Sequence, residues 1–512
     1  MTQADSAAIP QQAAWRKPLL QPWSCVALLI VAQLLIWTLV PYFAGTSLPL
    51  DVVSDGLAWG HQWQWGYYKH PPLPSWEVEA FFDAFGDIGP YLLSQISIGL
   101  TYLFVYLLGR ELMPARWAAA GTALAACVYY FSVPTPEFNH NVAQMPLWAA
   151  AIYAYYMAIE RRRLRWWLLL GAVGGMALLT KYASAVLSLT IVLHFFAASG
   201  RRAQLRSALP YAALVVCMLI VTPHLLWLYH NHFPTVSYAA QRAGRTHGIA
   251  LRLLAPLRFL LSQLVDISPA ILAAAIAGFL GRENFRQPAP EPEPMLRFLA
   301  TFTLGPAMLT ALLSLLTGWG LRDMWGAPMW NLAGLLIVAL SRPRWPQVSW
   351  PRLAGCIAAA FILFPVAYVL ATSTIPALQG RPSRTQWPDR AMAAAFDEAY
   401  RRQTGKPLRI VAADGWLGGL VAMADPSRPS VFTDGNWQEA PWITSARLAT
   451  DGALVIWRGN RSAPPPLLAL KSFKAVGFKT FAWPGIPKAA PLEIGWGIVP
   501  PAPGDNAGKS LP

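Results

Sequence analysis

Two carboxylates lie where a long polar segment begins, directly after the first apolar run of the chain. Asp51 and Asp55 are four residues apart, so a helix would place both on one face. A carboxylate at the edge of an apolar run costs free energy unless it is paired or hydrated, which favours a functional role. At least one of the two is therefore expected to act as a general base. The structural alternative is that Asp51 caps a helix.

A cationic corner follows in the same segment. Lys69 and His70 precede two prolines, which stiffen the chain at that point. An ammonium and an imidazole side by side are donors suited to a phosphate group, and the alternative is a solvated loop cation. Trp65 and Tyr68 belong to a cluster of aromatic residues around this corner. They would either stack on a sugar ring or form an aromatic belt at a membrane interface, and the belt is favoured.

A second polar set lies before the apolar run that begins at Val142, and it contains Glu137, Asn139, His140 and Asn141. Such side chains can bind sugar hydroxyls, and the alternative is that they cap the following helix. Lys181 and Arg322 each lie at the end of an apolar run. Either could hold a phosphate, or could extend its charge to the membrane interface. Asp323 could pair with Arg322.

Three histidines raise the question of a metal site. His224, His230 and His232 are six and two residues apart, a spacing that fits no zinc signature. His224, near the end of an apolar run, is expected to be a hydrogen-bonded polar group of the interior. Metal binding is left open.

The composition indicates what must position these residues. Of 512 residues, 55% are hydrophobic and only 13% are charged, about half the ~25% of soluble domains. This excludes a soluble globular protein, a disordered chain and a collagen, and four cysteines inside apolar runs exclude a disulfide scaffold. The net charge of +15 does not indicate nucleic-acid binding, because the basic residues form short clusters between apolar runs. The expected class is a polytopic membrane protein.

About eleven apolar runs are long enough to be membrane-embedded helices. Two of them are short and are expected to meet near the outer face, with Lys181 at the turn between them. The runs are residues 23–43, 89–109, 117–131, 142–159, 166–180, 184–198, 210–228, 257–280, 298–317, 325–340 and 353–371.

The distribution of Lys and Arg predicts the orientation. One set of alternate loops holds 17 of them, and the short loops of the other set hold 7. The richer set is expected to be cytoplasmic. This places residues 1–22 in the cytoplasm as an N-terminal tail and the loop 44–88 on the outer face.

The tail of the chain has a different composition. Residues 23–372 are expected to form the transmembrane domain, and residues 373–512 a small extracytoplasmic α/β domain with a disordered end. Strands are predicted at 408–413, 430–433, 453–457 and 478–482, and helices at 390–402 and 416–424. The predicted fold class is therefore mostly α, a polytopic helical bundle with a small C-terminal α/β domain.

The order of these features resembles the polytopic glycosyltransferases that use polyprenyl-phosphate sugars, the C-type superfamily and within it the protein-mannosyltransferase-like family 39. The resemblance covers about residues 20–370, and bacterial relatives include lipid A aminoarabinose and lipopolysaccharide galacturonosyl transferases. The motifs that carry it are Tyr-Tyr-Lys-His-Pro-Pro-Leu-Pro at 67–74, Phe-Asn-His-Asn-Val-Ala-Gln-Met-Pro at 138–146, Leu-Thr-Lys-Tyr-Ala at 179–183 and Leu-Arg-Asp-Met-Trp-Gly-Ala-Pro-Met-Trp at 321–330.

The resemblance implies a mechanism. A sugar passes from a polyprenyl-phosphate donor to a hydroxyl of a lipid, glycan or protein, with inversion, at the outer face of a bacterial inner membrane. The family's acid position falls on Asp55 or Asp51, with Asp55 favoured, although an extra residue stands near Ser54. The family's basic corner falls on Lys69 and His70. No cofactor is certain, and a divalent metal ion is possible.

Two other classes compete with a transferase. A transporter would contain repeats and charged residues at mid-membrane, and Asp266 is the main ionisable candidate inside a span. An assembly scaffold would use the bundle only as an anchor for the tail. The long acidic and aromatic first loop favours the transferase.

Overall fold

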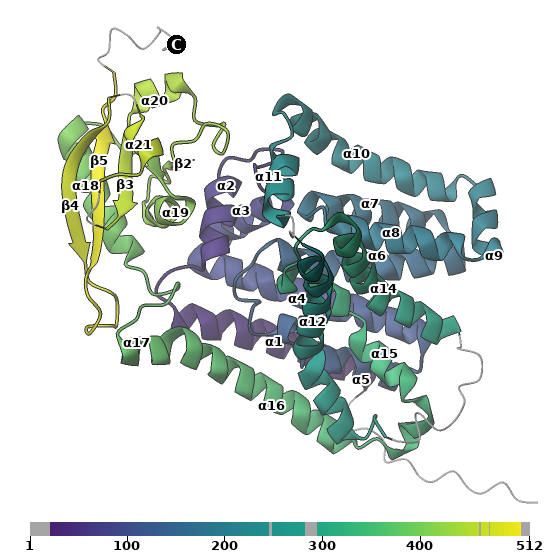
Figure 1. Cartoon of the computed structure of the whole chain (residues 1–512). Helices are drawn as coiled ribbons and strands as arrows, with labels where there is room; N and C mark the ends of the chain where they lie inside the picture. The colour runs from purple at the N-terminus through teal and green to yellow at the C-terminus, as the bar shows by residue number, and fades with distance from the viewer. Residues whose placement is uncertain (1–20, 245–247, 282–293, 460–461, 471, 503–512) are drawn as a thin grey trace, which may run out of the picture.

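The computed structural model describes residues 21–244, 248–281, 294–459, 462–470 and 472–502. It is a bundle of α-helices with a small α/β domain at one end, at the left of Figure 1. The predicted cytoplasmic tail, up to residue 20, and the predicted disordered end, from residue 503, lie outside the described residues. The predicted fold class is confirmed.

Each of the eleven predicted runs contains a helix. Seven helices of the described residues are long and apolar enough to cross a membrane, or nine if two bent pairs count as single spans. The helices of the bundle are α1 Pro22–Ala44, α4 Gly89–Leu112, α5 Ala115–Ala125, α6 His140–Arg161, α7 Leu164–Thr180, α8 Ser184–Phe196, α10 Leu209–His230, α12 Ile249–Ala277, α14 Pro294–Thr317, the pair η5 Asp323–Trp330 and α15 Ala333–Leu340, and α16 Trp350–Val369.

Several bundle helices are shorter than a span. The 17 residues of α7 extend about 25 Å, less than a hydrocarbon core of ~30 Å. The apolar run at 117–131 is not one helix, because α5 ends at Ala125 and a 3₁₀ turn follows at Tyr129–Phe131. The predicted break at Lys181 is confirmed, since α7 ends at Thr180 and α8 begins at Ser184.

Large apolar side chains cover the outside of the bundle. On α10, Leu219 is 69% exposed, and on α16, Leu363 is 62% exposed. In water such faces would associate, whereas lipid covers them at no cost. The inside is packed with aromatic rings, and Trp117 stacks on Trp345 with ring centroids 4.6 Å apart. The bundle is therefore built for a membrane.

The loop between α1 and α4, which is the predicted first outer loop, contains short helices. They are the π-helix η1 Val52–Leu57, α2 Ala58–Gly60, α3 Leu73–Phe85 and the turn η2 Gly86–Ile88. A π-helix closes its turn with one residue more than an α-helix, and such turns are frequent at functional sites. It contains Ser54 and Asp55, where the family resemblance implies an extra residue. A widened turn is one way to absorb such a residue.

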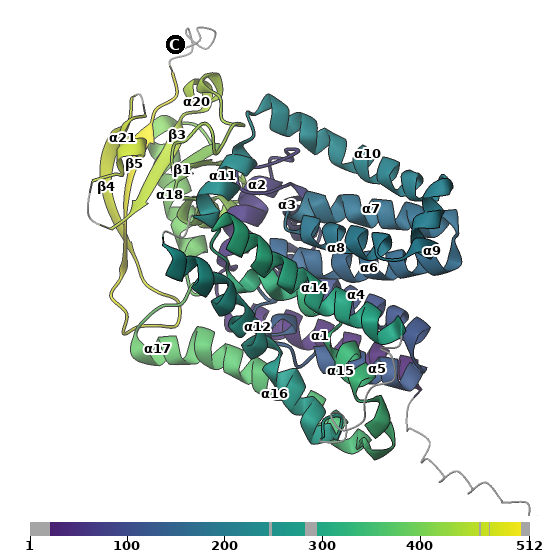
Figure 2. The ribbon, with the colours of Figure 1, turned by 45° about the vertical axis from the view of Figure 1, so that its right-hand side comes forward.

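Smaller elements complete the bundle. They are α9 Ser199–Arg202, η4 Ala203–Arg206, α11 Pro234–Ala243, η6 Arg342–Gln347, η7 Leu370–Thr374 and α17 Ile375–Gln379. The last two continue α16 to the α/β domain, as both views show (Figures 1 and 2).

The C-terminal domain is a five-stranded sheet with order β2-β1-β3-β5-β4. β1 pairs in parallel with β2 and β3, and the other pairs are antiparallel. Its elements are α18 Asp389–Thr404, β1 Ile410–Ala413, α19 Gly415–Ala424, β2 Ser430–Thr433, α20 Ser445–Asp451, β3 Ala453–Arg458, α21 Pro465–Leu468, β4 Lys474–Phe481 and β5 Leu492–Val499. All four predicted strands are present.

The fifth strand, β5, was not predicted, because its Gly495-Trp-Gly sequence is typical of a turn. The structure explains the first glycine. A Cβ on Gly495 would lie 2.2 Å from the ring of Trp457 on the neighbouring strand β3. The glycine therefore makes room for a side chain rather than for a turn.

The α/β domain is fixed to the first outer loop. Its helix α19 lies on the π-helix so closely that a Cβ on Gly419 would be 2.6 Å from Val53. Arg428 donates to both carboxylate oxygens of the buried Glu79 on α3, at 2.9 and 2.9 Å. His61 also bonds Glu79, at 3.0 Å. The domain thus helps to position the loop that carries Asp51 and Asp55.

Candidate active site

Asp51 lies at the start of the π-helix and is held by the loop between α5 and α6, the predicted second outer loop. The backbone N–H of Asp51 donates to Glu137 Oε1 at 2.9 Å. Asn139 Nδ2 donates to the Asp51 carboxylate at 3.2 Å. The Oδ1 of Asn139 accepts from the N–H groups of Asn141 and Val142, so Asn139 caps α6. The capping alternative for Asn139 is confirmed, and the same side chain also orients Asp51.

The surroundings of Asp51 change its proton affinity. Burial, followed by the negative charges of Glu137 and Asp55, raises the pKa of Asp51 to about 7. The hydrogen bond from Asn139 and the charge of Lys69 act in the opposite direction. A carboxylate with a pKa near neutrality can accept a proton from a hydroxyl and return it afterwards.

Asp55 forms an ion pair. Lys69 Nζ lies 3.1 Å from Asp55 Oδ1, and the Ser54 hydroxyl donates to the same oxygen at 3.2 Å. The ammonium also lies 5.4 Å from the ring of Trp59 and 5.2 Å from that of Tyr68. Burial acts to lower the pKa of Lys69, but the contact with Asp55 outweighs it and the pKa is raised. Lys69 is therefore a fixed cation.

A second cation approaches Asp51 from the break between α7 and α8. Lys181 Nζ donates to Asn141 Oδ1 at 2.6 Å and lies 5.8 Å from the ring of Trp325. Burial lowers the pKa of Lys181 to about 8, opposed by the negative charge of Asp51. Two lysines from distant segments thus converge on the two carboxylates.

His70 and His140 face each other with ring centroids 4.0 Å apart. Burial, together with the nearby His140 and Lys181, lowers the pKa of His70 well below its usual value. His70 is therefore neutral and could meet a phosphate only through an N–H, not as a cation. Nε2 of the buried His140 has no hydrogen-bond partner among the described residues.

Arg322 is not brought into this cluster by a direct contact. Its side chain is exposed at the start of η5 and forms no hydrogen bond or ion pair within the described part of the chain. Asp323 forms no ion pair with Arg322 among the described residues, and its carboxylate lies near the Tyr130 hydroxyl. The segment that contains Arg322 contacts Lys181 through the ring of Trp325, three residues further along the chain. A phosphate contact by Arg322 stays a prediction.

The two predicted aromatic ligands differ in their positions. Tyr68 is half-buried at the site, and its hydroxyl lies near the Glu439 carboxylate of the α/β domain. Trp65 is 45% exposed and rests edge-on against Trp76, with centroids 4.9 Å apart. Trp65 thus lies at the rim, as a belt residue would, and Tyr68 lies beside Lys69.

His224 is a satisfied interior group, as predicted. One ring nitrogen bonds the backbone oxygen of Trp65 at 2.7 Å, and the other meets the Tyr182 hydroxyl at 2.7 Å. No group of three His, Cys, Asp or Glu side chains is placed to hold a metal ion in the described ranges. The divalent metal ion stays an open possibility of the family.

The α/β domain supplies site residues that the sequence did not indicate. Glu439 lies near Tyr68. Burial, together with the negative charges of Glu439 and Asp414, raises the pKa of Asp434 to about 6. Asp414 and Asp434 follow the parallel strands β1 and β2 directly, and ligands of open α/β sheets lie outside such strand ends. The position of Asp434 at the end of a parallel strand could have marked it as a candidate from the sequence. Its proximity to Lys69, and that of Glu439, depends on how the α/β domain docks.

Comparisons with known proteins find similarity to glycosyltransferases. The family pattern described as dolichyl-phosphate-mannose-protein mannosyltransferase matches residues 69–227. The lipopolysaccharide core galacturonosyltransferase RgtA of Rhizobium johnstonii is 25% identical over 413 residues, which cover 78% of this chain and 79% of the relative. The undecaprenyl phosphate-α-4-amino-4-deoxy-L-arabinose arabinosyl transferase 1 of Pseudomonas fluorescens is 29% identical over 174 residues, 32% of this chain and 30% of the relative.

The fold has a solved counterpart. The crystal structure of ArnT from Cupriavidus metallidurans, bound to undecaprenyl phosphate, superposes with a TM-score of 0.60 at 14% identity. The match covers 92% of this chain and 97% of that chain. The order of the motifs, the sequence relatives and the fold all indicate a similarity to polytopic glycosyltransferases. The chain is a bacterial inner-membrane protein that is similar in sequence and in fold to the C-type polytopic glycosyltransferases of the protein-mannosyltransferase-like family.

Proposed function

We propose that this enzyme transfers a sugar from a polyprenyl-phosphate donor to a hydroxyl of a lipid or glycan at the outer face of the membrane, with inversion. A protein acceptor is the remaining alternative. One observation carries the proposal: two carboxylates and two lysines from distant segments meet in one half-buried site. A base for the acceptor and cations for a phosphate are what this reaction needs.

Asp51 is the proton acceptor in this proposal. The acceptor hydroxyl loses its proton to Asp51 while its oxygen forms a bond to the anomeric carbon. The bond from that carbon to the phosphate oxygen breaks, and its electron pair leaves with the polyprenyl phosphate. The pKa of about 7 suits Asp51 to this role, because a base works best near the pH at which it operates.

Asp55 positions Lys69 in the same proposal. The family pattern favours Asp55 as the base, but its ion pair with Lys69, at 3.1 Å, favours a role in holding that cation. Lys69 and Lys181 then stabilise the charge that develops on the leaving phosphate. His70 and His140 provide N–H donors beside them, and Tyr68 contributes an aromatic face to the sugar.

The orientation is part of the proposal. Arg110 and Arg161 lie in the last turns of α4 and α6, and Arg352 lies in the first turn of α16. These helix ends are opposite to those that meet the site and the α/β domain. A reporter fused after Arg163 should therefore be cytoplasmic, and one fused after Pro512 should be extracytoplasmic. A cytoplasmic signal after Pro512 would contradict this topology.

The transporter alternative rests on Asp266, which is buried in the span α12. Similarity to a glycosyltransferase family and the carboxylate–lysine site favour transfer over transport.

Mass spectrometry of envelope lipids and glycans tests the proposal directly. Cells that express the chain should contain a glycan or lipid with one added sugar, and cells without it should lack that species. Asp51→Asn should behave like the deletion, while the surface control Glu398→Gln should behave like the wild type. Identical envelopes with and without the chain would contradict the proposal.

A further inference from the structure

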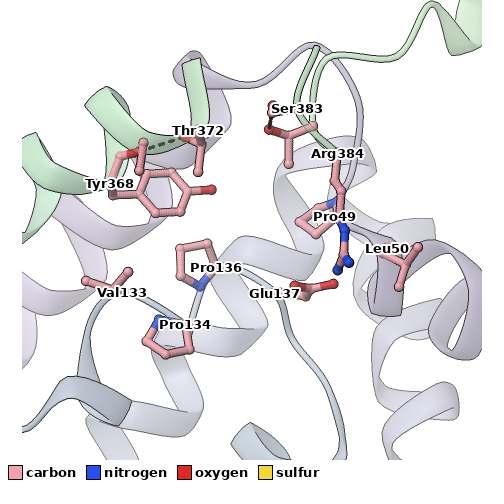
Figure 3. A pocket seen from close by; sticks show the side chains of 12 residues that line it. Pro49, Leu50, Val133, Pro134, Pro136, Glu137, Tyr368, Thr372, Ser383 and Arg384 are labelled. Carbon is pink, nitrogen blue, oxygen red and sulfur yellow. Dashed lines mark hydrogen bonds between the residues drawn. The ribbon is translucent and has the colours of Figure 1, made fainter. Parts of the chain in front are cut away.

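A cavity of about 290 Å³ opens beside Asp51, and no step of the proposed reaction uses it. Four segments build it at the end of the bundle that carries the site (Figure 3). They are the start of the first outer loop, the second outer loop, the end of α16 and the linker that follows. Its lining includes Pro49, Pro136, Glu137, Tyr368, Thr372 and Arg384.

Two charged groups of opposite sign face this cavity. Arg384 points from the linker toward Glu137, and both side chains line the cavity (Figure 3). Arg384 forms no hydrogen bond or ion pair with the residues that the structure describes. A guanidinium is a planar donor that matches carboxylate and phosphate groups. An unpaired one at the mouth of a cavity is available to an anion.

The rest of the wall is suited to a sugar ring. Three prolines, Pro49, Pro134 and Pro136, present rigid apolar faces, and the ring of Tyr368 adds another. The volume is close to the lower limit of ~300 Å³ for small-molecule pockets, which is room for one ring rather than for an extended chain. Apolar walls with a few charged groups are typical of sites that fix the orientation of a ligand.

Glu137 connects the cavity to the proposed base. Its carboxylate lines the cavity and also accepts the backbone N–H of Asp51 at 2.9 Å. A hydroxyl that donates to Glu137 from within the cavity would therefore lie close to Asp51. A ring held there would present its hydroxyls beside the proposed base, which is where the acceptor of the reaction must lie.

We infer that this cavity binds an acceptor sugar that bears an anionic group, with Arg384 on the anion and Glu137 on a ring hydroxyl. The anion is a carboxylate or a phosphate of a glycolipid. This inference rests on the proposed transfer and names the class of acceptor that it uses.

Steady-state transfer by the full-length protein in nanodiscs tests it. Arg384→Gln should raise the acceptor KM about ten- to a hundredfold, as expected for a lost charge-assisted contact, with little change in kcat. Arg384→Lys should recover part of the loss. The matched control is Arg381→Gln, which removes an exposed cation of the same linker outside the cavity. Donor binding, measured with undecaprenyl phosphate, should be equal in all variants.

A comparison of acceptor substrates shows whether the anion that binds Arg384 is a phosphate or a carboxylate. Lipid A with and without its phosphates, and core oligosaccharide before and after reduction of its carboxyl groups, are compared in the wild type. Removing the relevant anion should raise KM as much as Arg384→Gln does. Equal KM values for Arg384→Gln and Arg381→Gln, or equal use of charged and uncharged acceptors, would overturn the inference. A wild type that transfers sugar to no acceptor would instead refute the proposed function. If Arg384→Gln does not fold, the acceptor comparison in the wild type decides alone.

Discussion

Replacing Lys69 or Glu137 should shift the pH dependence of transfer in opposite directions. The charge of Lys69 lowers the pKa of Asp51, and that of Glu137 raises it. Lys69→Met removes the cation and keeps the length of the side chain, so the pKa of Asp51 should rise. Glu137→Gln removes the repelling charge and keeps the amide shape, so the pKa should fall.

The wild-type profile sets the scale. Asp51 must be deprotonated to accept a proton, so activity should increase with pH through about 7 and reach a plateau above it. At pH 6 only about a tenth of the molecules would carry the active carboxylate, and kcat/KM should be roughly a tenth of the plateau. Lys69→Met should move this midpoint to higher pH and Glu137→Gln to lower pH.

The assay is initial-rate transfer from pH 5 to pH 9 with purified protein, because kcat/KM reports groups of the free enzyme. Asp434 also titrates in this range, so Asp434→Asn is the matched control and should leave the midpoint near 7. Midpoints that move in the same direction in both variants, or a wild-type profile that is flat between pH 5 and pH 8, would refute the reasoning about Asp51.

Three further outcomes are expected. At the plateau pH, Lys69→Met should lower kcat about ten- to a hundredfold, since a charge-assisted contact contributes roughly 1.5–3 kcal/mol; unchanged turnover would show that Lys69 does not touch the phosphate. Asn139→Ala should destabilise the protein by about 1 kcal/mol through the lost helix cap and should also slow transfer, because Asp51 loses its donor; denaturant unfolding and initial rates check both. Arg428→Met should destabilise it by about 3–5 kcal/mol by leaving Glu79 buried without its bidentate partner, and an unchanged melting temperature would contradict this.

Much of the bundle could be predicted because its signal is local. Continuous apolar runs predict helices wherever they occur, and Lys181 marks the break between α7 and α8. The π-helix could not be predicted from the sequence pattern, because one widened turn has no periodicity of its own. Strand β5 was missed because Gly495 has a packing role that depends on Trp457 in another strand.

The site could be predicted as a set of residues but not as a set of contacts. The polar residues of two loops and Lys181 were expected at one membrane face, and the structure brings Asp51 and Asn139 together across 88 positions of sequence. Sequence could not separate Asp51 from Asp55, because the pKa of Asp51 depends on burial and on Glu137. The positions of Arg384 and Glu439 near the site depend on how the C-terminal domain docks, and no local sequence pattern encodes this docking.

The central claim is that Asp51 accepts the proton of the acceptor hydroxyl. Single-turnover transfer from an undecaprenyl-phosphate-linked sugar, measured in Asp51→Asn and Asp55→Asn beside donor binding, tests it most directly. Asp51→Asn should bind donor normally and lose roughly 10²- to 10⁴-fold in rate, whereas Asp55→Asn should lose less rate and also weaken donor binding by releasing Lys69. An Asp51→Asn protein with the wild-type rate, beside an inactive Asp55→Asn protein that binds donor normally, would contradict the claim and make Asp55 the base.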